Sequence, residues 1–118
     1  MAEKPVLWLG SSLDDLRAFP ADARRIAGHQ LHLVQLGLEP ADWKSMPNVG
    51  LGVMELRIRT ELEHRVFYIA KFAEAIYVLH AFQKKTRKTP KPDIESAKRR
   101  LQELVRLRQQ RKEKPDEH

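Results

Sequence analysis

The stretch VMELRIR (53–59) decides the fold, because apolar and charged residues alternate along it. The apolar residues are Met54, Leu56 and Ile58. The charged residues between them are Glu55, Arg57 and Arg59. A period of two belongs to a β-strand with one face buried and the other face open. The stretch therefore predicts a half-buried strand that carries its charges on a single face.

Two further strand-like segments follow. HRVFYIAKF (64–72) and AIYVLHAFQ (75–83) are rich in β-branched and aromatic residues, which favour strands. The breaks between the segments, TELE (60–63) and AEA (73–75), are short. Consecutive strands joined by such short links form an antiparallel meander. The middle of the chain therefore predicts three antiparallel strands.

Helical patterns lie on both sides of this meander. KPVLWLG (4–10) predicts a short first strand. Apolar residues at intervals of three and four then predict helices over 11–19 and 20–36, and residues 38–52 are expected to form a loop. After the meander, a last helix begins near Pro90, a residue that suits the first helical turn.

The resulting element order is β-α-α-β-β-β-α. This order predicts an α+β fold in which helices pack on one face of a small antiparallel sheet. Residues 1–108 are expected to form a single domain. Residues 109–118 are basic and lack an apolar stripe, so we expect them to fray as a C-terminal tail.

The positive charge of the chain is concentrated in its middle. The 118 residues carry a formal net charge of +6, and residues 44–91 contain ten basic and four acidic residues. A basic stripe on a sheet favours a polyanion as partner. Cysteine is absent, which excludes disulfides and thiolate chemistry and suits the cytoplasm, where we expect the protein. No apolar run approaches the length of a membrane span, so no membrane partner is expected.

Cations on the predicted strands form the candidate site. Alternation places Arg57 and Arg59 on the open face, and strand pairing can bring Arg65, Lys84 or Lys85 toward them. Clustered cations repel one another unless an anion or a carboxylate offsets them, and phosphate oxygens match guanidinium groups well. A solvated basic linker between strand and helix explains the last part of this cluster equally well, so both interpretations stay open.

Such a cluster has the groups needed to cleave RNA. Cleavage requires an activated 2′-OH, stabilised charge on the phosphorane and a protonated leaving oxygen. Lysine acts as a base when neighbouring cations lower its pKa, and arginine can hold the phosphorane. This chemistry requires no cofactor, and the histidines lack metal-ligand spacing, so no metal site is expected. His80 is a possible acid or base, and a buried structural role is at least as good an interpretation.

These segments resemble a known family. VMELRIR, HRVFYIAKF, YVLHAFQKKTRKTP (77–90) and DIESAKRRLQE (93–103) are similar to the phage-derived HigB-like toxins of the RelE/ParE superfamily. The resemblance covers residues 50–104, about half of the chain. It implies a RelE-like fold and the toxin of a type II toxin–antitoxin system. Such a toxin is an mRNA endoribonuclease that acts on the ribosome and is neutralised by a helix-turn-helix antitoxin similar to HigA.

The resemblance also implies residue roles. The catalytic set is Arg57, Arg65, Lys84 and Lys85, with the arginines on the scissile phosphate and the lysines supplying the base and further charge stabilisation. The resemblance places Arg87 and Lys88 on ribosomal RNA or message, and the strand cations Arg59 and Lys71 complete the expected RNA-binding set. Some relatives carry a functional aromatic residue or histidine near the C-terminus, where this chain has only His118, so a lysine-centred mechanism is favoured.

Two other functions fit the same residues. The superfamily also contains gyrase-directed toxins similar to ParE, and a fold alone does not determine a function. A non-catalytic module that binds RNA or a partner protein is the third possibility. Cleaved message would indicate the endoribonuclease. DNA damage with intact message would indicate the gyrase-directed toxin, and binding without toxicity would indicate the non-catalytic module.

Overall fold

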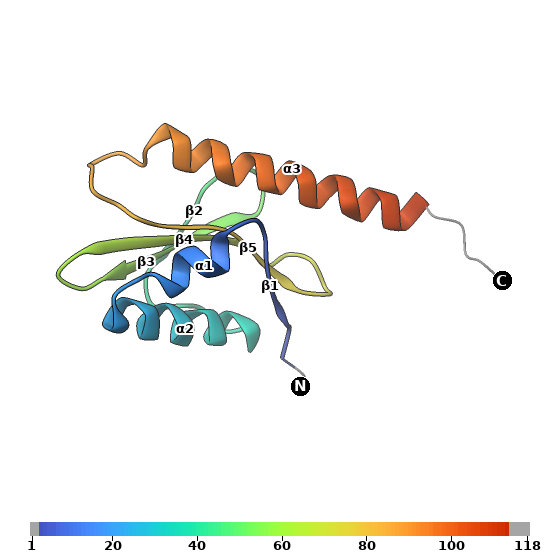
Figure 1. Ribbon diagram of the computed structural model, residues 1–118. Helices are drawn as coiled ribbons and strands as arrows, with labels where there is room; N and C mark the ends of the chain where they lie inside the picture. Colours follow the sequence, from blue (N-terminus) through green and yellow to red (C-terminus); the bar gives the residue numbers. More distant parts are fainter. Residues whose placement is uncertain (1–2, 114–118) are drawn as a thin grey trace.

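Helices lie on both sides of a five-stranded sheet in the computed structural model, which describes residues 3–113 (Figure 1). The strands are β1 (Val6–Trp8), β2 (Trp43–Ser45), β3 (Val53–Arg59), β4 (Glu63–Ile69) and β5 (Ile76–Gln83). The helices are α1 (Ser12–Arg17), α2 (Ala21–Gln35) and α3 (Lys91–Glu113). The α+β class is confirmed and the architecture is consistent with a RelE-like fold. The predicted order is also found, with β2 as an additional strand.

The sheet is mixed, which corrects the expectation of a purely antiparallel one. Its strand order is β1-β5-β4-β3-β2. The strands from β2 to β5 pair antiparallel, as the meander predicts, whereas β1 pairs with β5 in parallel. Parallel pairing requires a long crossover, and the chain between β1 and the meander, which includes α1 and α2, supplies it.

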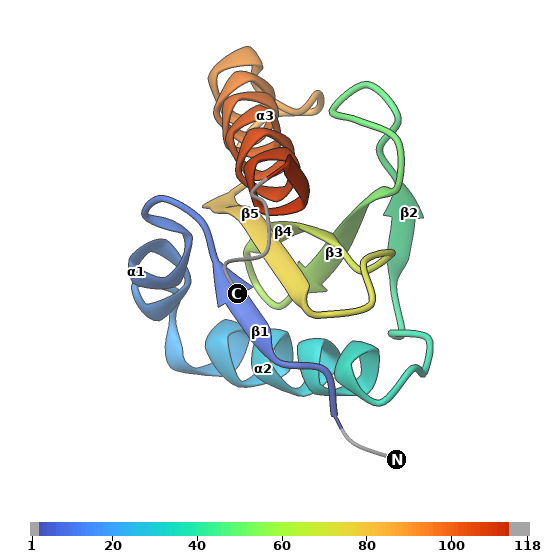
Figure 2. The same ribbon diagram turned by 90° about the vertical axis from the view of Figure 1, so that its right-hand side faces the viewer.

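Alternation along the strands gives the sheet two buried faces. Leu56, Ile58 and Val66 lie in a core with residues of α1 and α2. Phe67 and Leu79 lie in a second core on the opposite face, with residues of α3. Figure 2 shows α1 and α2 on one side of the sheet and α3 on the other. The expectation that the helices share one face therefore holds for α1 and α2, whereas α3 lies across the other face.

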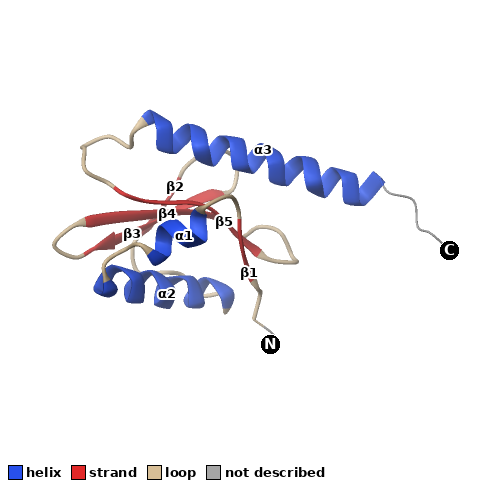
Figure 3. Cartoon of the chain, viewed as in Figure 1, coloured by secondary structure: helices blue, strands red, loops and turns tan. Residues whose placement is uncertain are grey.

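The charged positions of β3 belong to the face that carries α3. Their apolar neighbours Leu56 and Ile58 point into the α1–α2 core, so Glu55, Arg57 and Arg59 point the other way. Residues 84–90 connect β5 to α3 at one end of the sheet (Figure 3). The predicted open basic face therefore lies beside the start of α3.

The last helix is longer than predicted. It continues to Glu113, so residues 109–113 extend α3 where we expected a frayed tail. Residues 114–118, with His118, lie outside the described residues. None of the helices within residues 3–113 is long and apolar enough to cross a membrane.

Candidate functional site

Strand pairing brings together the arginines of β3 and β4. Arg57 and Arg65 are directly opposite each other in the antiparallel β3–β4 pair. Lys84 follows β5, and its backbone N–H donates a hydrogen bond to the carbonyl of Glu63 at 2.8 Å. The end of β5 therefore lies beside the beginning of β4. The expected convergence of these three cations is found.

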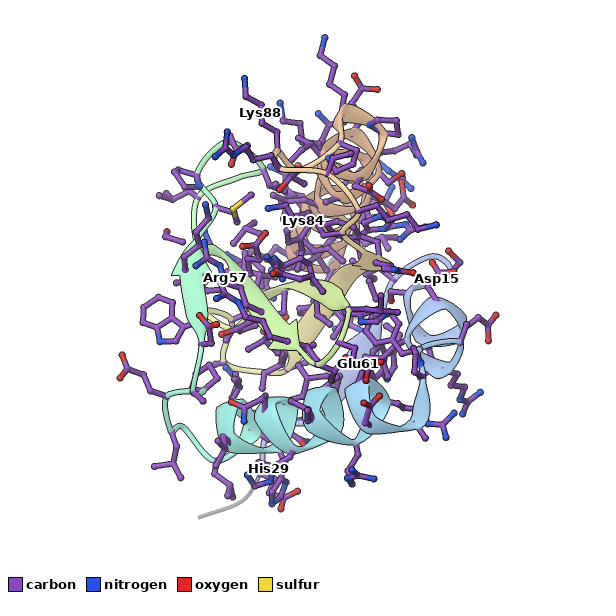
Figure 4. All side chains as sticks on the ribbon, turned by 90° about the vertical axis from the view of Figure 1, so that its left-hand side faces the viewer. Asp15, His29, Arg57, Glu61, Lys84 and Lys88 are labelled. Carbon is purple, nitrogen blue, oxygen red and sulfur yellow. The ribbon has the colours of Figure 1, made fainter. Side chains whose placement is uncertain are left out.

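A hollow of about 430 Å³ opens at this end of the sheet. Its lining residues are Arg57, Arg59, Glu63, Arg65, Lys84, Lys85, Thr86 and Arg87. We call it the basic hollow, because six of these eight residues are cations and only Glu63 is acidic. Figure 4 looks onto this end of the molecule, with Arg57 on β3 and Lys84 after β5.

A buried carboxylate lies beneath the arginines. Glu55 is only 2% exposed, and it accepts a hydrogen bond from Nε of Arg57 at 3.2 Å. The same carboxylate oxygen lies 3.7 Å from Nε of Arg65. A negative charge between two guanidinium groups offsets their repulsion. Glu55 therefore allows two arginines to occupy neighbouring positions at the bottom of the basic hollow.

Arg65 forms the floor of the basic hollow and Arg57 stands above it. The Arg65 side chain is 4% exposed and donates hydrogen bonds to the His64 carbonyl at 3.1 Å and to the Glu63 carboxylate at 2.5 Å. The hydrogen bond and charge of Arg65 lower the pKa of Glu63. The Arg57 side chain is 27% exposed. Arg57 can therefore contact an entering anion directly, while Arg65 contributes its charge from below.

The rim of the basic hollow contains both paired and unpaired cations. Arg59 lies 3.4 Å from the carboxylate of Asp42 and 3.9 Å from that of Glu63. The other rim cations are Lys84, Lys85 and Arg87. Within residues 3–113, no carboxylate forms an ion pair with any of these three. They remain available to a bound anion.

Lys71 and Lys88, two predicted RNA-binding residues, do not line the basic hollow. Lys71 follows the far end of β4, and its ammonium group lies 5.4 Å from the centre of the Phe72 ring. Lys88 lies farther along the connector toward α3, away from Arg57 (Figure 4). The remaining predicted cations of the site do meet there, from β3, β4 and the connector after β5.

His80 is also outside the basic hollow, and it joins β5 to α3. His80 as a whole is 8% exposed. Nε2 lies 2.7 Å from the Asp93 carboxylate, and Nδ1 lies 3.1 Å from the guanidinium of Arg100. Because a guanidinium group only donates, Nδ1 is the acceptor and Nε2 carries the proton. This geometry favours the structural interpretation of His80 over its use as an acid or base.

Two acidic residues of the site escaped the sequence analysis. Glu63 opposes Arg59 in the β3–β4 register, and Asp42 reaches Arg59 from the segment before β2. A strand register for β3 and β4 would have found Glu63, whereas Asp42 lies in a stretch without any strand pattern. Within the described residues, His, Asp and Glu side chains form no group of three that could bind a metal ion.

One family model matches most of the chain. Its description is phage derived protein Gp49-like (DUF891), and it matches residues 14–102, three-quarters of the sequence. The matched range contains every residue of the basic hollow. The Gp49-like family belongs to the RelE/HigB-like toxins. No curated protein sequence matches the chain at a significant level.

Proposed function

The chain belongs to the phage-derived Gp49-like family, and we propose that it is the toxin of a type II toxin–antitoxin pair. Its proposed activity is that of an endoribonuclease that cleaves mRNA on the ribosome and so inhibits translation. The observation that carries this proposal is the basic hollow, which Arg57 lines together with Lys84, Lys85 and Arg87, three cations without an ion pair among the described residues. This excess of cations is suited to an RNA phosphate.

The chemistry begins with the scissile phosphate in the basic hollow. Arg57 donates hydrogen bonds to its non-bridging oxygens, and Arg65 adds positive potential from the floor. When the 2′-oxygen attacks phosphorus, negative charge grows on the phosphorane. Cations that Glu55 already holds in place stabilise this charge without reorganising.

Two proton transfers complete the reaction. The 2′-OH loses its proton as the new oxygen–phosphorus bond forms, and the 5′-oxygen takes up a proton as its bond to phosphorus breaks. The products are a 2′,3′-cyclic phosphate and a fragment with a free 5′-OH. Lys84 and Lys85 are the proposed carriers of these protons, since they are the ionisable bases on the rim. No step uses a metal ion or a cofactor.

The proposed partners follow from the same surface. Arg87 and Arg59, at the exposed rim, are positioned to contact message or ribosomal RNA around the cleavage point. The toxin would be held inactive by a helix-turn-helix antitoxin similar to HigA. Its place of action would be the bacterial cytoplasm, where translation occurs.

The decisive experiment expresses the chain without an antitoxin in a bacterial host. We expect growth to stop and messages to be cut, with new 5′-OH ends. Arg57→Ala and Lys84→Ala should relieve both effects. Arg25→Ala is the matched control, because it removes an exposed cation from α2, outside the basic hollow. Circular dichroism of the purified variants verifies that each remains folded.

Other outcomes would identify another function. Growth arrest with DNA damage and intact messages would indicate a gyrase-directed toxin. Absence of toxicity, with salt-sensitive RNA binding, would indicate a non-catalytic module. Loss of cleavage in EDTA, restored by a divalent cation, would contradict the metal-independent chemistry.

A further inference from the structure

A second cavity lies at the opposite end of β5 from the basic hollow. It measures about 530 Å³ and lies between β1 and the C-terminal half of α3. Tyr77 lines it near the start of β5, whereas Lys84 follows the end of that strand. Seven residues of extended chain separate the two, which corresponds to about 23 Å. We call this cavity the β1–α3 groove.

The β1–α3 groove has apolar walls that are open to solvent. Leu7, on β1, and Leu107, on α3, both line it, and each is 45% exposed. Figure 1 shows the C-terminal half of α3 running past the end of the sheet. Apolar surface of this kind, gathered in a cavity, is typical of a site that another molecule covers.

The same cavity lies along an unpaired strand edge. β1 is the last strand of the sheet, with β5 as its only neighbour among the described strands. The carbonyl of Pro5 and the N–H of Leu9 both bond to β5, at 2.9 and 3.0 Å. Because successive residues of a strand point their polar groups to opposite sides, Val6 and Trp8 direct theirs to the free edge. An added strand can hydrogen-bond to these groups.

Charge decides which kind of molecule fits. The part of α3 from Leu104 to Lys112 contains four basic residues and no acidic one. Arg106 and Arg108 form ion pairs with Glu103 and Glu74, whereas Arg111, on the groove, and Lys112 form none with residues 3–112. A second copy of this chain at the edge of β1 would bring like charges together. An acidic partner segment would be attracted instead.

We propose that the β1–α3 groove binds an extended segment of a partner protein. The segment pairs with β1 as a sixth strand, places apolar side chains against Leu7 and Leu107, and directs acidic side chains toward Arg111. In a toxin–antitoxin pair the segment belongs to the antitoxin, and that identification rests on the proposed function. Binding of such a segment does not rest on it.

The test uses the full chain, labelled with nitrogen-15, and a short capped peptide in which leucine and glutamate alternate. We expect amide shifts in β1 and in the C-terminal half of α3. Leu107→Glu should weaken binding roughly tenfold, because one buried leucine contact is lost and a like charge is added. Leu51→Glu is the control, since Leu51 is 83% exposed and lies outside the groove.

A charge exchange makes the test specific. Arg111→Glu should weaken binding of the acidic peptide and strengthen binding of a peptide with lysine in place of glutamate. The proposal is overturned if no binding occurs, if the shifts fall on the basic hollow, or if Leu107→Glu binds like the unchanged chain. Absence of mRNA cleavage with intact peptide binding would contradict only the proposed function.

Discussion

Glu55 is the residue on which the arrangement of the basic hollow depends. It is buried, and its carboxylate serves both Arg57 and Arg65. We predict that Glu55→Gln lowers the free energy of unfolding by about 2 kcal/mol, because the substitution removes the buried negative charge between Arg57 and Arg65, and Arg65 keeps only its pair with Glu63. Urea unfolding measures this loss. Added phosphate should recover part of it by binding between the two arginines.

A matched substitution separates this effect from a general effect of charge. Glu61 lies in the turn between β3 and β4, is exposed, and forms no ion pair within residues 3–113 (Figure 4). Glu61→Gln removes the same charge and should change stability by less than about 0.5 kcal/mol. Equal losses for the two variants would show that burial of Glu55 is not the cause.

His64 makes stability depend on pH. Burial lowers the pKa of His64 below its ordinary value of 6.5, the charge of Asp22 opposes this effect, and Arg65 adds to it. Below pH 6.5 the unfolded chain therefore binds a proton that the folded chain excludes. The free energy of unfolding should be level above pH 6.5 and should fall as the pH drops through the folded pKa.

Thermal unfolding between pH 5 and pH 7 measures this slope. His64→Gln should flatten it, because glutamine does not titrate. His29→Gln, an exposed position on α2, should leave it unchanged. A slope that survives in His64→Gln would assign the pH dependence to another group.

At the scale of elements, Gly10 controls how α3 lies against the β1–α1 junction. Its φ is +55°, and an added Cβ would collide with the guanidinium of Arg100. That guanidinium donates hydrogen bonds to the Leu79 carbonyl at 2.9 Å and to the Ser11 hydroxyl at 3.0 Å, so it joins α3 to β5 and to the start of α1. Gly10→Ala should therefore lower stability by about 2 kcal/mol or more.

Gly28→Ala is the same chemical change at another position, and there we expect the opposite effect on stability. Gly28 lies inside α2, and an added Cβ there has nothing within 4 Å. Alanine favours the helix over glycine, so stability should rise by about 0.5 to 1 kcal/mol. Differential scanning calorimetry of the two variants compares them directly. Equal shifts in the same direction would contradict the role of Arg100.

Periodicity predicted the elements that are patterned and missed those that are not. β3 alternates in sequence, and its apolar face was predicted correctly, whereas the charged face is only partly open because Glu55 is buried. β2 was missed because all of Trp43–Ser45 is exposed, so no burial pattern marks it. The parallel pairing of β1 with β5 depends on contacts between distant segments, which single-sequence periodicity does not report. Lys71 is different, because its six-residue separation from Arg65 along one predicted strand already placed it at the other end of β4.

At the scale of the whole molecule, two different cavities lie at opposite ends of β5. The basic hollow gathers six cations at the end of that strand, and the β1–α3 groove gathers exposed leucines at its beginning. α3 runs from one to the other, and Asp93 and Arg100 fix its first half against His80. Under the two proposals, RNA and a partner protein use different ends of one small fold.

Because the basic hollow and the β1–α3 groove lie apart, we predict that only cations of the basic hollow affect how RNA binding responds to salt. Affinity for a short single-stranded RNA should fall steeply with salt concentration, because binding releases counterions from its phosphates. Arg57→Ala and Lys84→Ala should each reduce the slope of log K against log salt by about 0.7, the value for one phosphate contact on a single strand. Arg25→Ala, on α2, should leave the slope unchanged, and so should Leu107→Glu in the β1–α3 groove. Fluorescence anisotropy across a salt series measures all four. An equal reduction for Arg25→Ala would mean that RNA binding depends on the net charge of the whole chain. It would contradict the basic hollow as the RNA-binding site.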